Sequence, residues 1–387
     1  MKPNRILVTG ATGFIGSRLC ELLSLEHRMP HRALVRQFSR AARIARLDSR
    51  LVAGDLLDVG SLDRALEGCD AVVNLAHADD RTAKAQTSNL VDACVRAGVR
   101  RLVHISSMAV HGPSPNMPIV TESTAPIKRW REAYSDAKAA AEAVVLAAAG
   151  QGKLAAVVLR PTIVYGPFSF FVTPIVADAR QGRISLIDGG QGICNAVYVD
   201  DVCSAIIAAL QRDDAVGSAF LINGDTRLTW RDFISTFAGM VEGDKVIHDH
   251  SADEIAAHWS AQRPRKRDSF KSAIRLAGSP AFHAQLSTIH PLGALIRGMK
   301  ELVAKRITAE QKLMLKFRLR GRSAAANAVA NERPAIPMPS QGRVVREAYR
   351  AWVSNDLAKS GLGWAPAYSF EDGAMRTGEW LRFARLT

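Results

Sequence analysis

The sequence predicts an α/β fold: a Rossmann-type, doubly wound parallel sheet with a smaller C-terminal substrate-binding part that carries a helical basic insertion. Strand-like apolar runs alternate with helical patterns from residue 5 to residue 159, as in βαβ units. A glycine-rich turn joins the first run to the first helix. Small or polar residues follow each run, where ligands bind in such sheets.

The first unit is the best defined. The apolar run from Arg5 to Thr9 leads into Gly10-Ala11-Thr12-Gly13-Phe14-Ile15-Gly16 and then into a helical pattern. Gly10 permits a tight turn, Gly13 lets backbone N–H groups approach a pyrophosphate, and Gly16 allows close helix–strand packing. The helix N-terminus adds the positive end of its dipole. We therefore expect a dinucleotide site at this turn.

The second strand, residues 32–35, ends at Arg36, with Arg40 and Arg43 close behind. In a dinucleotide site an acidic residue here would hold the ribose 2′-OH of NAD, and an arginine would hold the 2′-phosphate of NADP. The sequence therefore favours NADP over NAD. A solvated basic loop is the structural alternative.

The later strands are expected at residues 51–56, 70–77, 101–105 and 154–159, with a helix at residues 86–97. Asp55 ends the third strand, where it would cap the adenine side. Gly10, Arg36, Asp55, Ala76 and Ser107 all fall at the carboxyl ends of predicted strands.

Tyr134 and Lys138 lie four residues apart in a helical pattern, so they share one face. An ammonium beside a phenol stabilises the phenolate and lowers a pKa that is ordinarily about 10. Tyr134 could then exchange a proton near neutral pH. The spacing alone fits equally well an aromatic ring packed under a lysine stem, so its meaning depends on the other motifs.

Those motifs, in order, resemble the extended branch of the short-chain dehydrogenase/reductase family, the NAD(P)-dependent epimerase/dehydratase group. The resemblance covers roughly residues 1–250 and 355–387. It rests on Thr9–Gly16, Gly54-Asp55-Leu56, Asn74-Leu75-Ala76, Ser106–Gly112, Tyr134–Lys138, Arg160-Pro161, Val199–Val202, Gly363–Pro366 and Ser369–Gly373.

The resemblance implies a role for each matching residue. Ser107 would polarise the substrate oxygen, Tyr134 would be the general acid/base, and Lys138 would hold the nicotinamide ribose and lower the tyrosine pKa. Ser106 would lie beside the nicotinamide, and Pro161 would contact its carboxamide. The implied cofactor contacts are Gly10, Thr12, Gly13, Phe14, Ile15, Gly16, Arg36, Asp55, Leu56, Ala76, Ser106, Tyr134, Lys138 and Pro161.

Two departures from the family pattern concern the substrate more than the reaction. His111 stands where the family often has a tyrosine that lines the sugar pocket. Ala83 stands roughly where an asparagine is common, while Asn89 matches a packing position. A proton relay would then run through water or another group.

Composition places the chain among globular proteins, and residues 1–165, with 195–225 returning to them, are expected to form the Rossmann domain. Residues 166–387 would form mainly the substrate-binding part, with the basic insertion at about 250–350. Five scattered cysteines without metal-ligand spacing indicate free thiols in a reducing compartment, with no metal site. The sequence shows neither a leader peptide nor a membrane-spanning run, which indicates a cytoplasmic protein.

The net charge of +14 comes from residues 262–350, which hold 19 Lys and Arg against 5 Asp and Glu; the remainder holds 32 of each. Apolar residues at helical spacing between the basic ones predict basic amphipathic helices. These would cover the enzyme's own surface or contact an anionic membrane peripherally, at its inner face. No nucleic-acid motif accompanies the charge, so no nucleic-acid partner is expected. A homodimer stays open.

The leading functional hypothesis is an oxidoreductase or epimerase acting on a hydroxyl or keto carbon of a nucleotide-activated sugar by a Tyr–Lys–Ser proton relay and hydride transfer. An NADPH-dependent reductase of a hydrophobic, flavonoid- or steroid-like ketone is the alternative that Arg36 favours. Met108 and Ala109 replace the acid pair of a dehydratase, so dehydration is disfavoured. A non-catalytic dinucleotide sensor or scaffold is the alternative of another class.

Overall fold

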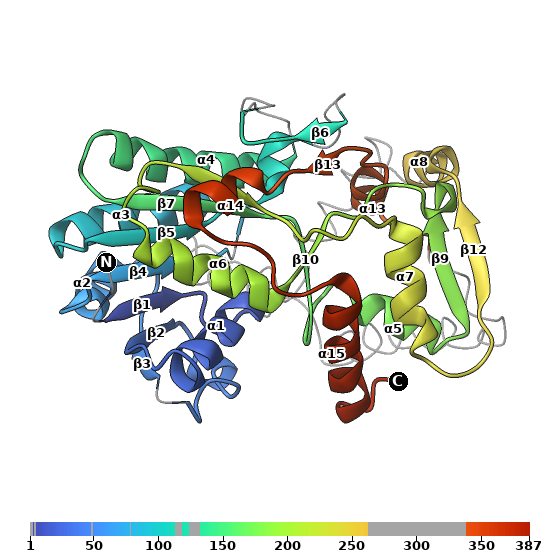
Figure 1. The fold of residues 1–387 in the computed structure, drawn as a ribbon, viewed down its shortest axis with the longest axis horizontal. Coiled ribbons are helices and arrows are strands. Elements are labelled where there is room, and N and C mark those ends of the chain that lie inside the picture. The colour runs from blue at the N-terminus through green and yellow to red at the C-terminus, as the bar shows by residue number, and fades with distance from the viewer. Residues whose placement is uncertain are drawn as a thin grey trace, which may run out of the picture. The chain divides into compact units, whose positions relative to one another are not determined.

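The computed structural model describes residues 3, 5–47, 49–77, 79–112, 118–123, 132–261 and 338–387. Its centre is a seven-stranded parallel sheet in the order β11-β7-β5-β4-β1-β2-β3 (Figure 1). The strands are β1 (Ile6–Thr9), β2 (His31–Val35), β3 (Arg50–Ala53), β4 (Ala71–Asn74), β5 (Arg101–Ile105), β7 (Ala156–Pro161) and β11 (Ala219–Ile222). The order reverses at β1, which is the switch point where a doubly wound sheet binds ligands. The predicted fold class is confirmed.

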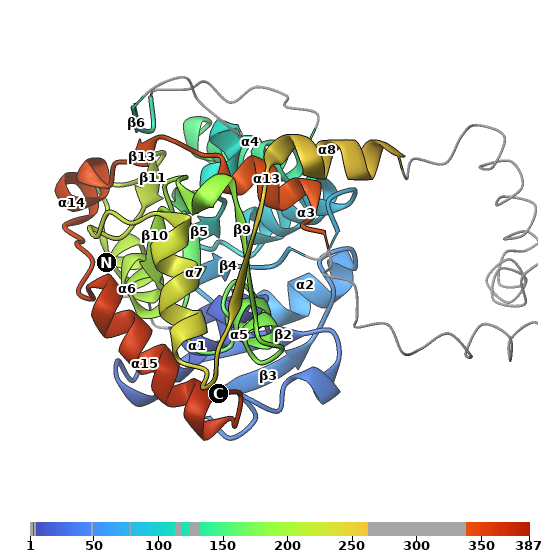
Figure 2. The same ribbon diagram turned by 90° about the vertical axis from the view of Figure 1, so that its right-hand side faces the viewer.

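Helices cover both faces of this sheet (Figure 2). One face carries α1 (Phe14–Leu25) and α6 (Val199–Gln211), and the other carries α2 (Val59–Leu66), α3 (Ala83–Arg96) and α4 (Ala133–Gly150). Both faces of the central strands are therefore apolar, as the continuous hydrophobic runs predict.

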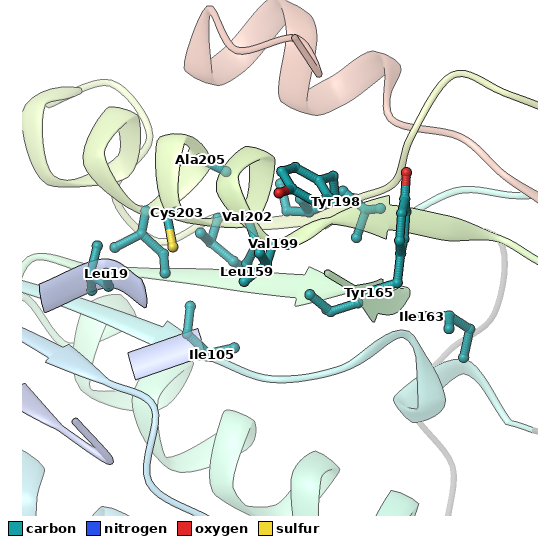
Figure 3. Close-up of a cluster of buried hydrophobic side chains, with 14 of the residues drawn as sticks. Leu19, Ile105, Leu159, Ile163, Tyr165, Tyr198, Val199, Val202, Cys203 and Ala205 are labelled. Carbon is teal, nitrogen blue, oxygen red and sulfur yellow. The ribbon is translucent and has the colours of Figure 1, made fainter. Parts of the chain in front are cut away.

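The core between α6 and the sheet fixes the carboxyl ends of β5 and β7. Figure 3 shows Leu19 of α1 and Val202 of α6 in one cluster with Ile105 and Leu159 of the sheet. All four side chains are at most 5% exposed. Replacing one of the two leucines or the isoleucine with alanine would lower the free energy of unfolding by about 2–5 kcal/mol, because such cores are close-packed.

Six other strands form three smaller parallel pairs among the described residues. They are β8 (Ile163–Tyr165) with β10 (Ala196–Tyr198), β9 (Arg183–Ile187) with β12 (Val246–His250), and β6 (Ile119–Val120) with β13 (Trp352–Val353). The helices α5 (Thr173–Ala179) and α7 (Trp230–Gly239) pack on each other and on β9. The chain closes with α13 (Gln341–Glu347), α14 (Asp356–Leu362) and α15 (Phe370–Phe383).

The closing sequence motifs hold the C-terminal segment against α6. The Trp364 indole donates to the Asp201 carbonyl oxygen at 3.1 Å and to Ser204 Oγ at 2.8 Å. Asp201 Oδ1 accepts from the backbone N–H of Ala367 at 2.7 Å. Burial, only partly offset by such bonds, raises the pKa of Asp201 to about 6. The closing motif thus packs the C-terminal segment against α6 in this structure.

The chain divides into two compact units, residues 1–252 with 342–387, and residues 253–341. In the second unit the described residues include most of α8 (Ala252–Ala261), whose Trp259 indole donates to the Pro339 carbonyl oxygen at 2.7 Å. The expected basic amphipathic helices between His290 and Arg322 lie outside the described residues. The five cysteines are buried and free, as expected.

No helix in the described ranges combines the length and the apolar character needed to cross a bilayer.

Candidate active site

The glycine turn between β1 and α1 is a surface made of backbone. Gly10 has φ +66°, and a Cβ there would lie 2.8 Å from the Ala76 backbone nitrogen. A Cβ on Gly16 would lie 2.2 Å from the Gly10 carbonyl oxygen. Gly13 is the N-cap of α1, and the first turn of α1 has no acidic residue to compete with an anion.

These features fit a dinucleotide pyrophosphate, because side chains at the glycines would fill the space that the phosphates need. Thr12, Phe14 and Ile15 are half-buried in the same turn. Ser17 Oγ donates to the Gly13 carbonyl oxygen at 2.7 Å and keeps the turn closed. The turn expected from the sequence therefore has the shape that the cofactor requires.

The ribose end of the expected site is basic. Arg36 immediately follows β2 and is exposed, as is Arg40. No ion pair within the described ranges involves either residue. Arg43 differs, because it pairs with Glu21 Oε1 at 2.8 Å and its guanidinium lies 4.2 Å from the Phe168 ring centroid. Of the three arginines, Arg36 and Arg40 are thus the ones available to a 2′-phosphate.

The loop after β3 is held in place by its own polar groups. Asp55 Oδ1 accepts from the Leu57 N–H at 2.9 Å. Asn89 of α3 donates to the Leu56 carbonyl oxygen at 3.0 Å, which agrees with its expected packing position. Asp55 remains half-buried at the carboxyl edge of the sheet.

Tyr134, Ser107 and Lys138 lie together beyond β5. Glu132 caps α4 by accepting from the N–H groups of Tyr134 at 3.3 Å and Ser135 at 2.7 Å. The Ser107 hydroxyl lies close enough to the Tyr134 phenol to lower its pKa, and Ser107 Oγ accepts from the Ala109 N–H at 3.2 Å. Lys138 Nζ lies 6.0 Å from the Tyr134 ring centroid and donates to the Ile105 carbonyl oxygen at 2.9 Å.

Burial controls the protonation of this cluster. It raises the pKa of Tyr134, and Asp80 and Glu132 raise it further, whereas the hydrogen bond from Ser107 lowers it. Burial also lowers the pKa of Lys138 to about 8. The net shift of the Tyr134 pKa is therefore upward, opposite to the lowering expected from the lysine. Partial burial of the phenol, which is still 38% exposed, outweighs the effect of an ammonium that donates to the Ile105 carbonyl oxygen.

His77 and Asp80 are neighbours of Tyr134 that the sequence analysis missed. The His77 ring packs edge-on against Tyr134, with centroids 5.1 Å apart. His77 Nε2 lies 2.8 Å from Asp80 Oδ1. Burial, and then the charge of Lys138, lower the pKa of His77. Ala83, where the family pattern has asparagine, is buried at the start of α3 and has no polar side chain. Between β4 and α3, His77 and Asp80 are therefore the polar side chains found near Tyr134.

Ser106 and Pro161 end adjacent strands. The Ser106 N–H donates to the Leu159 carbonyl oxygen at 2.8 Å. Its buried hydroxyl has no hydrogen-bond partner among the described residues. Pro161 is the last residue of β7 and is paired in register with Ile222 of β11. An unpartnered buried hydroxyl at this edge fits a site that a polar ligand completes.

His111 lies in the interior of the protein. It is fully buried, and its Nε2 lies 3.2 Å from Arg160 Nη1. Arg160 Nε donates to Glu142 Oε2 at 3.1 Å, forming a buried ion pair between β7 and α4. His111 therefore lies buried against this ion pair, and the effect on the substrate of replacing the family tyrosine stays a prediction.

The sheet brings most of the expected site residues to one edge. Parallel register places Thr9 beside Asn74, Asn74 beside His104, and Ile105 beside Leu159. The residues that follow these strands, including Gly10, Ala76, Ser106 and Pro161, share that edge. Arg36 and Asp55 follow the outer strands β2 and β3.

Comparison with known proteins agrees with this geometry. The sequence profile of the NAD dependent epimerase/dehydratase family matches residues 6–223. The chain is 31% identical over 291 residues to a 4-hydroxy-2-methyl-3-oxo-4-farnesyl-3,4-dihydroquinoline-1-oxide ketoreductase from Stigmatella aurantiaca, covering 70% of this chain and 85% of the relative. It is 30% identical to a 2-alkyl-3-oxoalkanoate reductase from Stenotrophomonas maltophilia, covering 71% and 86%.

Similar solved structures include dTDP-glucose 4,6-dehydratase from Bacillus anthracis in complex with NAD, with a TM-score of 0.66 and 18% identity over 99% of both chains. The Thermus thermophilus UDP-glucose 4-epimerase complex with NAD has a TM-score of 0.62 and 19% identity, covering 98% of this chain and 99% of the epimerase. At these identities the similarity establishes the shared fold.

Proposed function

Because the chain belongs to the NAD dependent epimerase/dehydratase family, we propose that it reduces a ketone flanked by apolar groups, with NADPH as the preferred cofactor. It is an NAD(P)-dependent enzyme of the short-chain dehydrogenase/reductase type. Family membership gives the enzyme class. The direction of the reaction, the substrate class and the preference for NADPH are what we propose in addition.

The observation that carries the substrate class is the chemistry named for the relatives that this chain matches over 70% and 71% of its length. One acts on an oxo group in a farnesylated ring system, and the other on the oxo group of an alkylated oxoalkanoate. Both substrates join a ketone to apolar carbon. We infer the same class for this chain.

Side chains near the catalytic cluster support reduction over dehydration. Met108 and Ala109 follow Ser107, so no acidic side chain stands at these two positions to remove a proton from the neighbouring carbon. Exposed Arg36 offers a cation to a 2′-phosphate, which favours the cofactor that net reductases consume.

The proposed mechanism assigns one step to each side chain. A dinucleotide held at the glycine turn would supply the hydride for reduction of the carbonyl carbon. Tyr134 donates its hydroxyl proton to the carbonyl oxygen, and Ser107 donates a hydrogen bond to the same oxygen as negative charge develops there. Lys138 stabilises the resulting phenolate through its charge, and a solvent proton then restores the phenol.

The high pKa of Tyr134 suits this direction. A phenol whose pKa is raised remains protonated at neutral pH, so it enters the reaction ready to donate. His77, linked to Asp80, packs edge-on against Tyr134 and so restricts the orientation of its ring. We assign His77 a positioning role.

Two other functions remain as predictions from the sequence. A nucleotide-sugar epimerase would use the same three side chains, and the solved relatives with the same fold include such enzymes. A dinucleotide sensor would bind the cofactor without turnover. An absorbance assay with NADPH separates the proposed reductase from both alternatives: a 2-alkyl-3-oxoalkanoate should consume NADPH, whereas UDP-glucose and dTDP-glucose should not. Chromatography of the sugar nucleotides then separates an epimerase, which converts them, from a sensor, which does not. Equal inactivity toward every ketone would overturn the proposal.

The peripheral membrane contact is proposed from the charge of residues 262–350 alone. If this segment binds anionic lipid, the protein should sediment with phosphatidylserine vesicles at low salt and be released as salt screens the attraction. Recovery in the supernatant with both anionic and neutral vesicles would contradict it. The homodimer likewise stays a prediction, which the mass in solution tests.

A further inference from the structure

A small pocket lies among α5, β9, α7 and α13, and we call it the α5–α7 pocket. Its volume is about 160 Å³. Phe171, Ile175, Ile184 and Ile234 supply most of its apolar wall. None of the residues assigned above to the cofactor or to proton transfer lines it. Whole-ligand pockets usually occupy roughly 300–1,000 Å³, so this one is sized for one arm of a ligand.

Two hydrogen-bond donors of the lining have no acceptor among the described residues. They are Trp230 Nε1 and Arg346 Nε, and both atoms are buried. The Arg346 guanidinium lies 5.3 Å from the Phe171 ring centroid and 5.4 Å from the Trp230 ring centroid. A buried donor without an acceptor is costly, so two at one pocket indicate that something else supplies the acceptor.

The carboxylates of the lining are already paired with other arginines. Glu347 accepts from Arg343 Nε at 2.6 Å and from Arg343 Nη2 at 3.1 Å. Asp178 pairs with Arg183 at 2.8 Å. The Glu347 oxygen nearest to Arg346 is 3.7 Å away, beyond hydrogen-bond distance.

Arg346 is therefore the cation of the pocket with unmet hydrogen-bonding capacity. Its side chain is 35% exposed although Nε itself is buried, so a ligand entering from solvent can reach the other atoms of the side chain. Burial of the rest of the guanidinium lowers the pKa of Arg346, and Glu347 only partly opposes this. Arginine nevertheless remains charged at working pH.

We propose that the α5–α7 pocket binds an alkyl carboxylate, with the carboxylate on Arg346 and Trp230 and the alkyl chain among the apolar wall. Arginine binds carboxylates strongly because both partners are charged and geometrically matched. The apolar wall rewards each buried methylene. Identifying this group as an arm of the substrate rests on the proposed function, whereas the binding itself does not.

The test is a calorimetric titration of the full-length protein with decanoate below its micelle concentration, and with decan-1-ol as the uncharged probe. Decanoate should bind the wild type at least tenfold more tightly than decan-1-ol. Arg346→Gln should weaken decanoate binding by about 10–100-fold, and Trp230→Phe, which keeps the ring and removes the N–H, by a few-fold. Arg350→Gln changes an exposed arginine outside the lining and should leave the affinity unchanged.

Equal affinity for decanoate in the wild type and Arg346→Gln would overturn the proposal, as would equal binding of the two probes by the wild type. Thermal unfolding of each variant identifies a general loss of fold, and Trp230→Phe provides the answer if Arg346→Gln does not fold. Failure of the proposed function would differ, since it would appear as absent ketone reduction with decanoate binding intact.

Discussion

The carboxyl edge of the sheet with the glycine turn, here called the dinucleotide edge, includes Gly10, Gly16 and Arg36. It and the α5–α7 pocket are built in different ways. At the dinucleotide edge the shape comes from backbone, because Gly10 and Gly16 leave no room for a Cβ. In the α5–α7 pocket the shape comes from side chains of four separate elements, and Arg343 meets Ser185 across 158 residues of sequence. A site of the first kind recurs wherever its short motif recurs, whereas the second kind is specific to one chain.

The largest effect is expected from Gly10→Ala, which should abolish NADPH binding at the dinucleotide edge. A Gly10→Ala side chain meets both a left-handed φ, which costs about 1–2 kcal/mol, and the backbone of Leu75 and Ala76, which adds about 1–3 kcal/mol. We expect loss of NADPH binding by fluorescence titration and a lower melting temperature. Gly98→Ala is the matched control, because Gly98 has φ +67° with no atom within 4 Å of the added Cβ. Equal effects of the two substitutions would contradict the close approach.

Tyr134→Phe is expected to have the next largest effect and to leave the dinucleotide edge intact. Loss of the proton donor should lower kcat by about 10²–10⁴-fold, with a much smaller change in the NADPH dissociation constant, since Tyr134 is only one of many expected cofactor contacts. Tyr368→Phe removes a phenol hydroxyl elsewhere and should retain full activity. Unchanged kcat in Tyr134→Phe would remove this tyrosine from the mechanism.

The pH dependence of kcat tests the charge state of the catalytic cluster, which burial controls. Lys138, with a pKa of about 8, is protonated below that pH and loses its charge above it. Tyr134, with a raised pKa, stays protonated through the same range. We therefore expect kcat for reduction to be level below pH 8 and to fall up to about tenfold per pH unit above it.

The variant Lys138→Met should remove this alkaline fall and leave a low, pH-independent rate. Lys359 lies on α14 and pairs with Asp225, far from the cluster in sequence, so Lys359→Met should keep the alkaline fall in kcat. An alkaline fall that persists in Lys138→Met would assign the titration to another group.

The smallest expected effect concerns cofactor choice at the rim of the dinucleotide edge. Arg36→Gln should weaken NADPH binding about tenfold and NADH binding little, because only NADPH carries the 2′-phosphate. Fluorescence titration of both nucleotides measures the ratio, with Arg382→Gln on α15 as a distant control. An unchanged ratio would place 2′-phosphate recognition elsewhere.

The sequence predicted those features that depend on local backbone. The strand–turn–helix of residues 6–25 was predicted because apolar runs and glycine spacing act within a few residues. The third strand ends at Ala53 in the structure, earlier than the predicted 51–56, because Gly54 starts a turn that Asp55 and Ser61 close. Strand ends are set by such side-chain bonds, which periodicity does not register.

Features that depend on long-range side-chain contacts were missed or misread. His111 is buried against Arg160, which lies 49 positions later in the chain, and nothing in the sequence indicated this contact. The His77–Tyr134 contact joins a loop after β4 to the start of α4. The α5–α7 pocket has no sequence signature, because Trp230 and Arg346 are 116 positions apart and only the fold brings their unpartnered donors to one pocket.

The most direct test of the proposed reaction follows the hydride. The protein is mixed with NADPH deuterated at both C4 positions and a 2-alkyl-3-oxoalkanoate, and the product is analysed by mass spectrometry. The account predicts net consumption of NADPH and one deuterium on the carbinol carbon, with both lost in Tyr134→Phe. Unchanged NADPH and an undeuterated ketone, alongside conversion of a nucleotide sugar without net cofactor use, would contradict it.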